Sequence, residues 1–103
     1  MPAPVPWMTR TDRYILDLLD QAGIAVPPKV IWTNLRDRHG EAAPSRRQIA
    51  RRLGNELFHH GLVCQPFADE ARGLYALTDL GERFCQDPTA DPREFVAELN
   101  ASE

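Results

Sequence analysis

The sequence predicts a mainly α-helical fold with a small β-hairpin, and three observations support this fold class. Apolar residues recur with helical spacing between residues 9 and 60. After Gly61 the spacing changes to that of short strands. A last helical pattern follows the strands, so we expect an additional C-terminal helix. With 103 residues and 43% hydrophobic content, the chain should form one compact domain with a real core.

The most informative stretch is residues 45–60, which we predict to form a helix. Ser45 followed three residues later by Gln48 is a capping box, in which each side chain bonds a free backbone N–H at the start of a helix. Gly61 lies where a helix usually ends. An apolar stripe with a spacing of four residues should face the core, and it consists of Ile49, Leu53 and Leu57.

The other face of this helix carries an excess of positive charge. Six polar side chains lie opposite the apolar stripe or beside it: Arg47, Gln48, Arg51 and Asn55 on the opposite face, and Arg46 and Arg52 at its flanks. The helix therefore has four arginines against a single acid, Glu56, in a chain whose net charge is −3. Because the whole chain has no general attraction for polyanions, any binding to nucleic acid has to come from this local patch.

Two helices are predicted before residue 45. Thr9 or Thr11 caps the first, which ends at Gly23, and Ile24 beyond it is expected as a hydrophobic clasp. The second covers about residues 28–39 and opens at a proline pair, since proline is tolerated in a first turn. The apolar sides of the two helices consist of Ile15, Leu18, Leu19 and Ala22 in the first and Val30, Ile31 and Leu35 in the second.

Two segments of strand character, residues 62–65 and 74–77, predict a β-hairpin. The loop between them contains Asp69 and Glu70 beside Arg72. The two acids would repel phosphates, so the loop either contributes little to binding DNA or touches its backbone through Arg72 alone. A short helix is expected after the hairpin.

The chain is expected to have three parts. Residues 1–8, with prolines at positions 2, 4 and 6, should form an extended arm, and residues 9–86 the folded domain. Residues 87–103 should form the C-terminal helix, capped by Asp91 with Pro92 at its first position. Phe95, Val96 and Leu99 lie beyond the body of the domain, which predicts a dimerisation element; the alternative is that they fold back as a cap on the first helix.

The order of three helices and a hairpin is that of a winged helix-turn-helix, whose third helix enters the major groove of DNA. Residues 11–84, with DRYILDLLDQAGIAVPPKVIWTNL, SRRQIARRL, GLV and LYALTDLG, resemble the small winged-helix proteins of haloarchaea and their viruses related to the halophage phiH repressor. The most specific part is Gly-Ile-x-x-Pro-Pro at residues 23–28. The resemblance implies sequence-specific transcriptional regulation in an archaeal cell, commonly repression by a dimer.

Two functions agree with these observations. In the first, the chain binds double-stranded DNA as a transcriptional regulator. Arginine, glutamine and asparagine can bond to base edges, so Arg47, Gln48, Arg51 and Asn55 would read bases. Arg46, Arg52 and Arg72 would then hold phosphates. In the second, the winged helix is a protein-interaction module whose arginine face docks on an acidic partner.

Other kinds of chemistry are not expected. His59, His60 and Cys64 lie close together in the sequence, but a metal site needs three or four converging ligands, so we expect none. No catalytic arrangement occurs at a recognisable spacing, and we expect neither an enzyme, a cofactor nor a small-molecule ligand. Without a membrane-spanning run or a signal-like block, the protein is expected in the cytoplasm, with Cys64 and Cys85 as reduced structural thiols.

Overall fold

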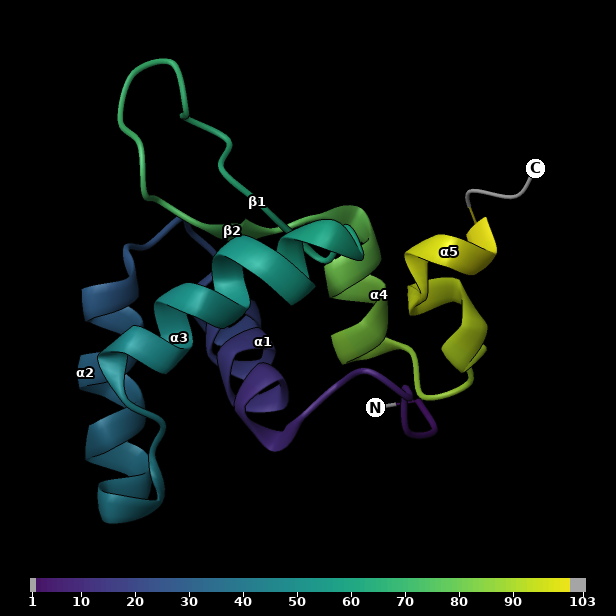
Figure 1. Cartoon of the computed structure of the whole chain (residues 1–103), viewed down its shortest axis with the longest axis horizontal. Helices are drawn as coiled ribbons and strands as arrows, with labels where there is room; N and C mark the ends of the chain where they lie inside the picture. Colours follow the sequence, from purple (N-terminus) through teal and green to yellow (C-terminus); the bar gives the residue numbers. More distant parts are fainter. Residues whose placement is uncertain (1, 101–103) are drawn as a thin grey trace.

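The computed structural model describes residues 2–100 and has the predicted fold, a mainly helical winged helix-turn-helix with a two-stranded sheet (Figure 1). Five α-helices lie in the described part, and α3 runs across the front of the molecule in this view, with α1 behind it. Their bounds are α1 Arg10–Ala22, α2 Pro28–His39, α3 Arg46–Arg52, α4 Asp79–Gln86 and α5 Ala97–Asn100. Short 3-10 turns occupy Gly40–Ala42 and Pro92–Phe95, and the strands are β1 Val63–Cys64 and β2 Ala76–Leu77.

The limits of α1 and α2 follow from their capping residues. Thr9 caps α1 through a reciprocal pair with Asp12, in which each side chain accepts from the other residue's backbone N–H. The helix ends at Gly23, whose φ of 67° lies in the left-handed region that favours glycine. Ile24 is 67% exposed, so the predicted hydrophobic clasp is wrong. α2 runs from Pro28 to His39 as expected.

The third helix changes from α-helical to π-helical geometry midway. Ser45 caps α3 by accepting from the Gln48 backbone N–H, and a π-helical segment, Leu53–Leu57, continues α3 directly. An α-helix turns slightly past a full turn in four residues, whereas a π-helix falls short of one. Leu53 and Leu57 are both fully buried, so the change keeps the predicted apolar stripe turned toward the core over its whole length.

The predicted hairpin is confirmed and is joined by a third segment. β1 and β2 pair antiparallel, with Val63 opposite Leu77. Val26, between α1 and α2, exchanges two backbone hydrogen bonds of 2.9 Å with Tyr75. The loop from Gln65 to Gly73 projects beyond the helices as the wing (Figure 1).

The two ends of the described chain pack together beside α4. The second half of the N-terminal segment is packed on the body of the domain: Val5 is 2% exposed, and the Trp7 indole donates a 2.7 Å bond to the Phe95 carbonyl. The prediction of a single C-terminal helix is wrong: Asp91 caps the turn Pro92–Phe95, extended backbone at Val96 interrupts it, and α5 follows.

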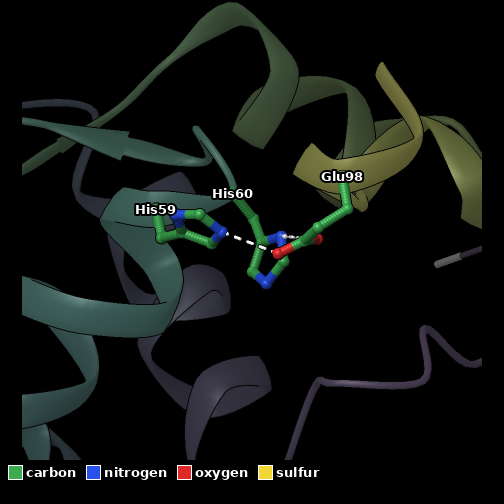
Figure 2. A group of neighbouring side chains, drawn as sticks. All are labelled: His59, His60 and Glu98. Atoms are coloured by element: carbon green, nitrogen blue, oxygen red, sulfur yellow. Dashed lines mark hydrogen bonds and ion pairs between the residues drawn. The ribbon is translucent and has the colours of Figure 1, made fainter. Parts of the chain in front are cut away.

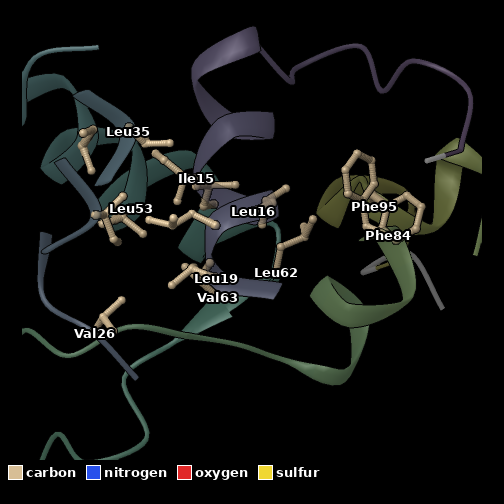
Figure 3. Close-up of a cluster of buried hydrophobic side chains, with 14 of the residues drawn as sticks. Ile15, Leu16, Leu19, Val26, Leu35, Leu53, Leu62, Val63, Phe84 and Phe95 are labelled. Carbon is tan, nitrogen blue, oxygen red and sulfur yellow. The ribbon is translucent and has the colours of Figure 1, made fainter. Parts of the chain in front are cut away.

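Phe95 belongs to the core of the domain (Figure 3). It is fully buried and meets Phe84 of α4 edge to face, with ring centroids 5.2 Å apart. The expectation that Phe95 lies beyond the body of the domain is therefore wrong. The core also contains Leu53, at the centre of the predicted stripe.

No helix among residues 2–100 has the length and apolar character needed to cross a bilayer.

Candidate nucleic-acid interface

The outer face of α3 carries exposed arginines without acidic partners. Arg46, Arg47 and Arg51 are all exposed, and within residues 2–100 none of them pairs with a carboxylate. The buried Ile49 lies on the side opposite Arg47 and Arg51, and Arg46 lies at the flank. Three guanidinium groups are therefore free to bond an external anion or a planar hydrogen-bonding edge.

Small residues leave this face accessible. Ala50 and Gly54 are exposed between the long side chains, and a Cβ atom added at Gly54 would meet nothing within 4 Å. A surface or groove can approach the backbone of the helix closely at these two positions. Asn55, in the π-helical segment, is exposed as well.

Gln48 lies where predicted, but its side chain has a partner inside the molecule. Its amide nitrogen donates a 3.3 Å bond to the Thr11 hydroxyl of α1. Only half of the predicted capping box is therefore formed, since the Gln48 side chain reaches α1 and not the Ser45 N–H. The bond is exposed and long, so it can open without leaving a buried polar group unpaired.

Arg52 lies at the flank of the helix, beside the buried stripe, but its side chain has partners inside the fold. Its Nε and Nη2 atoms donate bonds of 2.8 and 2.6 Å to the two carboxylate oxygens of Asp12, which is fully buried in α1. A third bond reaches the Trp7 carbonyl. The Asp12 partner raises the pKa of Arg52 above its usual value. The guanidinium is thus bound within the fold, which corrects the prediction that Arg52 holds a phosphate.

One arginine that the sequence analysis did not select, Arg36 of α2, lies beside the start of α3. Arg36 lies in the last turn of α2, is exposed, and sits with its guanidinium carbon 5.3 Å from the centre of the Trp32 ring. Arg36 and Arg46 line the same shallow hollow between α2 and α3. The sequence signal for Arg36 is its position in the last turn of α2, because the short connection that follows brings this turn close to the start of α3.

The wing presents charges of both signs. Asp69, Glu70 and Arg72 are all exposed, as predicted from the loop composition. The Gly73 N–H donates to the Gln65 side chain and fixes the base of the loop. Phe67, in the same loop, is 49% exposed.

A cluster of polar side chains, His59, His60 and Glu98, lies at the C-terminal end of the third helix (Figure 2). His59 Nε2 is 2.8 Å from a carboxylate oxygen of Glu98, and His60 Nδ1 is 3.8 Å from the other oxygen. His60 also stacks on Trp7 and accepts a bond from the Ala97 N–H. Burial lowers the pKa of His60, and the hydrogen bond to His59 lowers that of Glu98. The sequence reasoning missed Glu98 because it lies far from the histidines along the chain.

Comparison with known proteins gives one structural likeness. No family model matches the chain, and no curated protein matches it. The crystal structure of a PhiH1 repressor-like protein from Haloarcula marismortui is similar to this chain, with 29% sequence identity and a TM-score of 0.61. The match covers 82% of this chain and 84% of that chain. The likeness supports a loose relationship to that protein and agrees with the winged-helix fold.

Proposed function

We propose that this protein is a transcriptional regulator, a repressor, that binds double-stranded DNA by inserting the helix of residues 45–60 in the major groove. The observation that carries the proposal is the row of exposed arginines on α3 without acidic partners, on the side opposite the buried Ile49. The likeness to a PhiH1 repressor-like protein supports the same class of function.

The side chains of α3 divide into two groups by their position on the helix. Arg47, Arg51 and Asn55 follow one another every four residues on the outer face, so they suit contacts with base edges, and Gln48 joins them once its bond to Thr11 opens. Arg46, at the first turn, and Arg36, on the neighbouring helix, suit phosphates at the edge of the groove. Arg72 is the one cation that the wing offers to the backbone.

The second candidate function is a protein-interaction module whose arginine face docks on an acidic partner. The observation that favours it is the pair of exposed acids, Asp69 and Glu70, on the wing, which would meet a phosphate backbone unfavourably. The two functions differ in how binding responds to random DNA at low salt. A regulator retains salt-sensitive, sequence-independent affinity for any duplex, whereas an interaction module has none.

The test is a titration of the full chain against fluorescent duplexes, first random DNA and then fragments recovered from genomic DNA by pull-down. We expect binding to random DNA at low salt that weakens steeply as salt rises, and tighter binding to the recovered fragments. The double variant Arg47→Ala/Arg51→Ala should lose both the binding to random DNA and the tighter binding to the recovered fragments. Arg93→Ala is the matched control, because Arg93 is exposed on the C-terminal segment and pairs with Asp91.

The opposite result would reject the proposal. A wild-type chain that binds no duplex at low salt, or a double variant that binds as well as the Arg93→Ala control, contradicts DNA binding through α3. If the wild-type chain binds no duplex but does bind an acidic peptide, the interaction module is favoured.

We further propose that the regulator acts as a homodimer in the cytoplasm. Phe95 is in the core, so the exposed apolar side chains at the C-terminal end of the fold, Phe58 at 53% and Leu99 at 52% exposure, are the candidates for the contact. Light scattering of the full chain at micromolar concentration should give twice the mass of the chain. The monomer mass would reject the dimer and leave the DNA-binding proposal to its own test.

A further inference from the structure

We infer that His59, His60 and Glu98 form a binding site for one divalent transition-metal ion of the zinc class (Figure 2). One ring nitrogen from each histidine and one carboxylate oxygen lie within 4.8 Å of one another. The two histidines end the third helix and Glu98 comes from α5, so the site joins two segments that are remote in the sequence.

The spacing of the ligand atoms suits such an ion. Around a tetrahedral zinc ion with bonds of about 2.0–2.1 Å, neighbouring nitrogen and oxygen ligands lie roughly 3.3 Å apart. His59 Nε2 lies 2.8 Å from one Glu98 oxygen and His60 Nδ1 lies 3.8 Å from the other, so the present contacts fall on both sides of that value. Small changes in the Glu98 side chain, which is 64% exposed, therefore bring both nitrogens and an oxygen to bonding distance.

The kind of ligand decides the class of ion. Two imidazoles and one carboxylate are a donor set that zinc and its neighbours among the divalent transition metals accept, and three protein ligands leave a further position for water. Magnesium and calcium prefer oxygen ligands alone, so they fit this set poorly. Cys64 and Cys85 do not belong to the cluster, and we expect no thiolate bond to the metal.

The site is held in place on one side and open on the other. The His60 ring stacks on Trp7 with centroids 4.2 Å apart and is 7% exposed, so its orientation is fixed. His59 has a side chain that is 57% exposed, beside a shallow hollow also lined by Asn55 and Phe58, through which an ion can enter. A metal bound to His60 Nδ1 takes the lone pair that now accepts from the Ala97 N–H, so this hydrogen bond is lost and the first residue of α5 has to turn away slightly.

Binding would strengthen a weak connection. The His59–Glu98 ion pair is exposed on both sides, and such pairs contribute little to stability in water. A metal ion bonded to both side chains and to His60 would clamp α5 on the end of the third helix. An ion that binds only the folded chain raises the melting temperature as its concentration rises.

The experiment uses the full chain after removal of metal with EDTA, in reducing buffer without phosphate. Zn²⁺ alone is titrated by calorimetry and by thermal melting, and Co²⁺ alone by visible absorption. We expect one Zn²⁺ per chain, a melting temperature that rises by several degrees, and Co²⁺ bands in the visible without a thiolate charge-transfer band in the near ultraviolet. Mg²⁺ should leave the melting temperature unchanged.

Variants at two of the three ligands, His59 and Glu98, distinguish the site from the rest of the chain. His59→Ala and Glu98→Gln change exposed side chains, so both should fold, and each should lower Zn²⁺ affinity at least about tenfold. His39→Ala is the matched control, because His39 stacks on Tyr14 of α1 and lies outside the cluster. It should bind Zn²⁺ as the wild type does.

Four results would each overturn the assignment. They are no melting shift of the wild type in Zn²⁺, unchanged affinity in both His59→Ala and Glu98→Gln, loss of affinity in His39→Ala, and a thiolate charge-transfer band with Co²⁺. None of these measurements involves DNA, so the metal site and the proposed function stand or fall separately.

Discussion

Arg52 of the third helix and Asp12 of α1 form a two-bond ion pair inside the domain, with Asp12 fully buried and the Arg52 side chain 18% exposed. One Asp12 oxygen also accepts from the backbone and hydroxyl of Thr9, so the pair ties the start of α1, the N-terminal segment and the third helix together. This pair holds the third helix against α1.

The first prediction concerns this pair. Arg52→Ala leaves a buried carboxylate without its cation, and we expect the free energy of unfolding to fall by about 3 kcal/mol in urea melts. The double variant Arg52→Ala/Asp12→Ala should lose less than the sum of the two single losses, since the two side chains interact. Arg51→Ala is the control, because the neighbouring exposed arginine should change stability by less than about 0.5 kcal/mol. Equal losses in the two single arginine variants would contradict the structural role of Arg52.

The sequence predicted most of the helices because their signals are local. The Thr9 cap, the Gly23 end and the stripe of Ile49 and Leu53 each depend on residues within one or two turns. The predictions that were wrong concern features that depend on contacts between residues distant in the sequence. Helical spacing assigns Arg52 to a flank, but only the fold brings it to Asp12, and only the fold places Trp7 against Phe95.

The candidate site was predictable in part for the same reason. The exposure of Arg47 and Arg51 follows from their position opposite the apolar stripe, a property of one helix. The cluster of His59, His60 and Glu98 joins two segments across the fold. No spacing in the sequence relates them, and the predicted single C-terminal helix would have placed Glu98 differently.

The second prediction contrasts two glycines. A Cβ atom at Gly81, in the first turns of α4, would collide with the Leu62 carbonyl and press on Leu77. Gly81→Ala should therefore lower the free energy of unfolding by about 1–3 kcal/mol. Gly54 has open space around it and no left-handed backbone, so Gly54→Ala should raise the same quantity by up to about 1 kcal/mol. Chemical melts of both variants test the two expected signs, and a Gly81→Ala chain as stable as the wild type would show that α4 does not approach the Leu62 carbonyl this closely.

The third prediction concerns the reactivity of Cys85. Burial, with help from Asp20 and Asp17, raises the pKa of the Cys85 thiol to about 12, and its sulfur donates to the Leu16 carbonyl. Since the thiolate is the nucleophile, native Cys85 should react with iodoacetamide at pH 8 roughly a thousandfold more slowly than an unfolded thiol. The measurement uses Cys64→Ser, so that only Cys85 reports. Denaturant should restore the ordinary rate, and rapid labelling of the native chain would show that the thiol is not held in its protonated form.

The last prediction separates base reading from phosphate contact on α3. Arg51 lies at the middle of the outer face, whereas Arg46 lies at the first turn beside the hollow shared with α2. Arg51→Ala should cost roughly 1–3 kcal/mol on a selected operator and much less on a scrambled duplex, because a lost base contact removes discrimination. Arg46→Ala should weaken both duplexes alike and reduce the salt slope by about one, because a lost phosphate contact releases one counterion fewer.

Both variants replace exposed side chains without an acidic partner among residues 2–100, so their melting temperatures should match the wild type and serve as the control for folding. The titrations are made with each duplex at several salt concentrations. If Arg51→Ala weakens operator and scrambled DNA equally, the outer face of α3 does not read bases, and if Arg46→Ala leaves the salt slope unchanged, the start of the helix does not touch phosphate. Because discrimination and salt slope are independent quantities, each residue is tested without reference to the other.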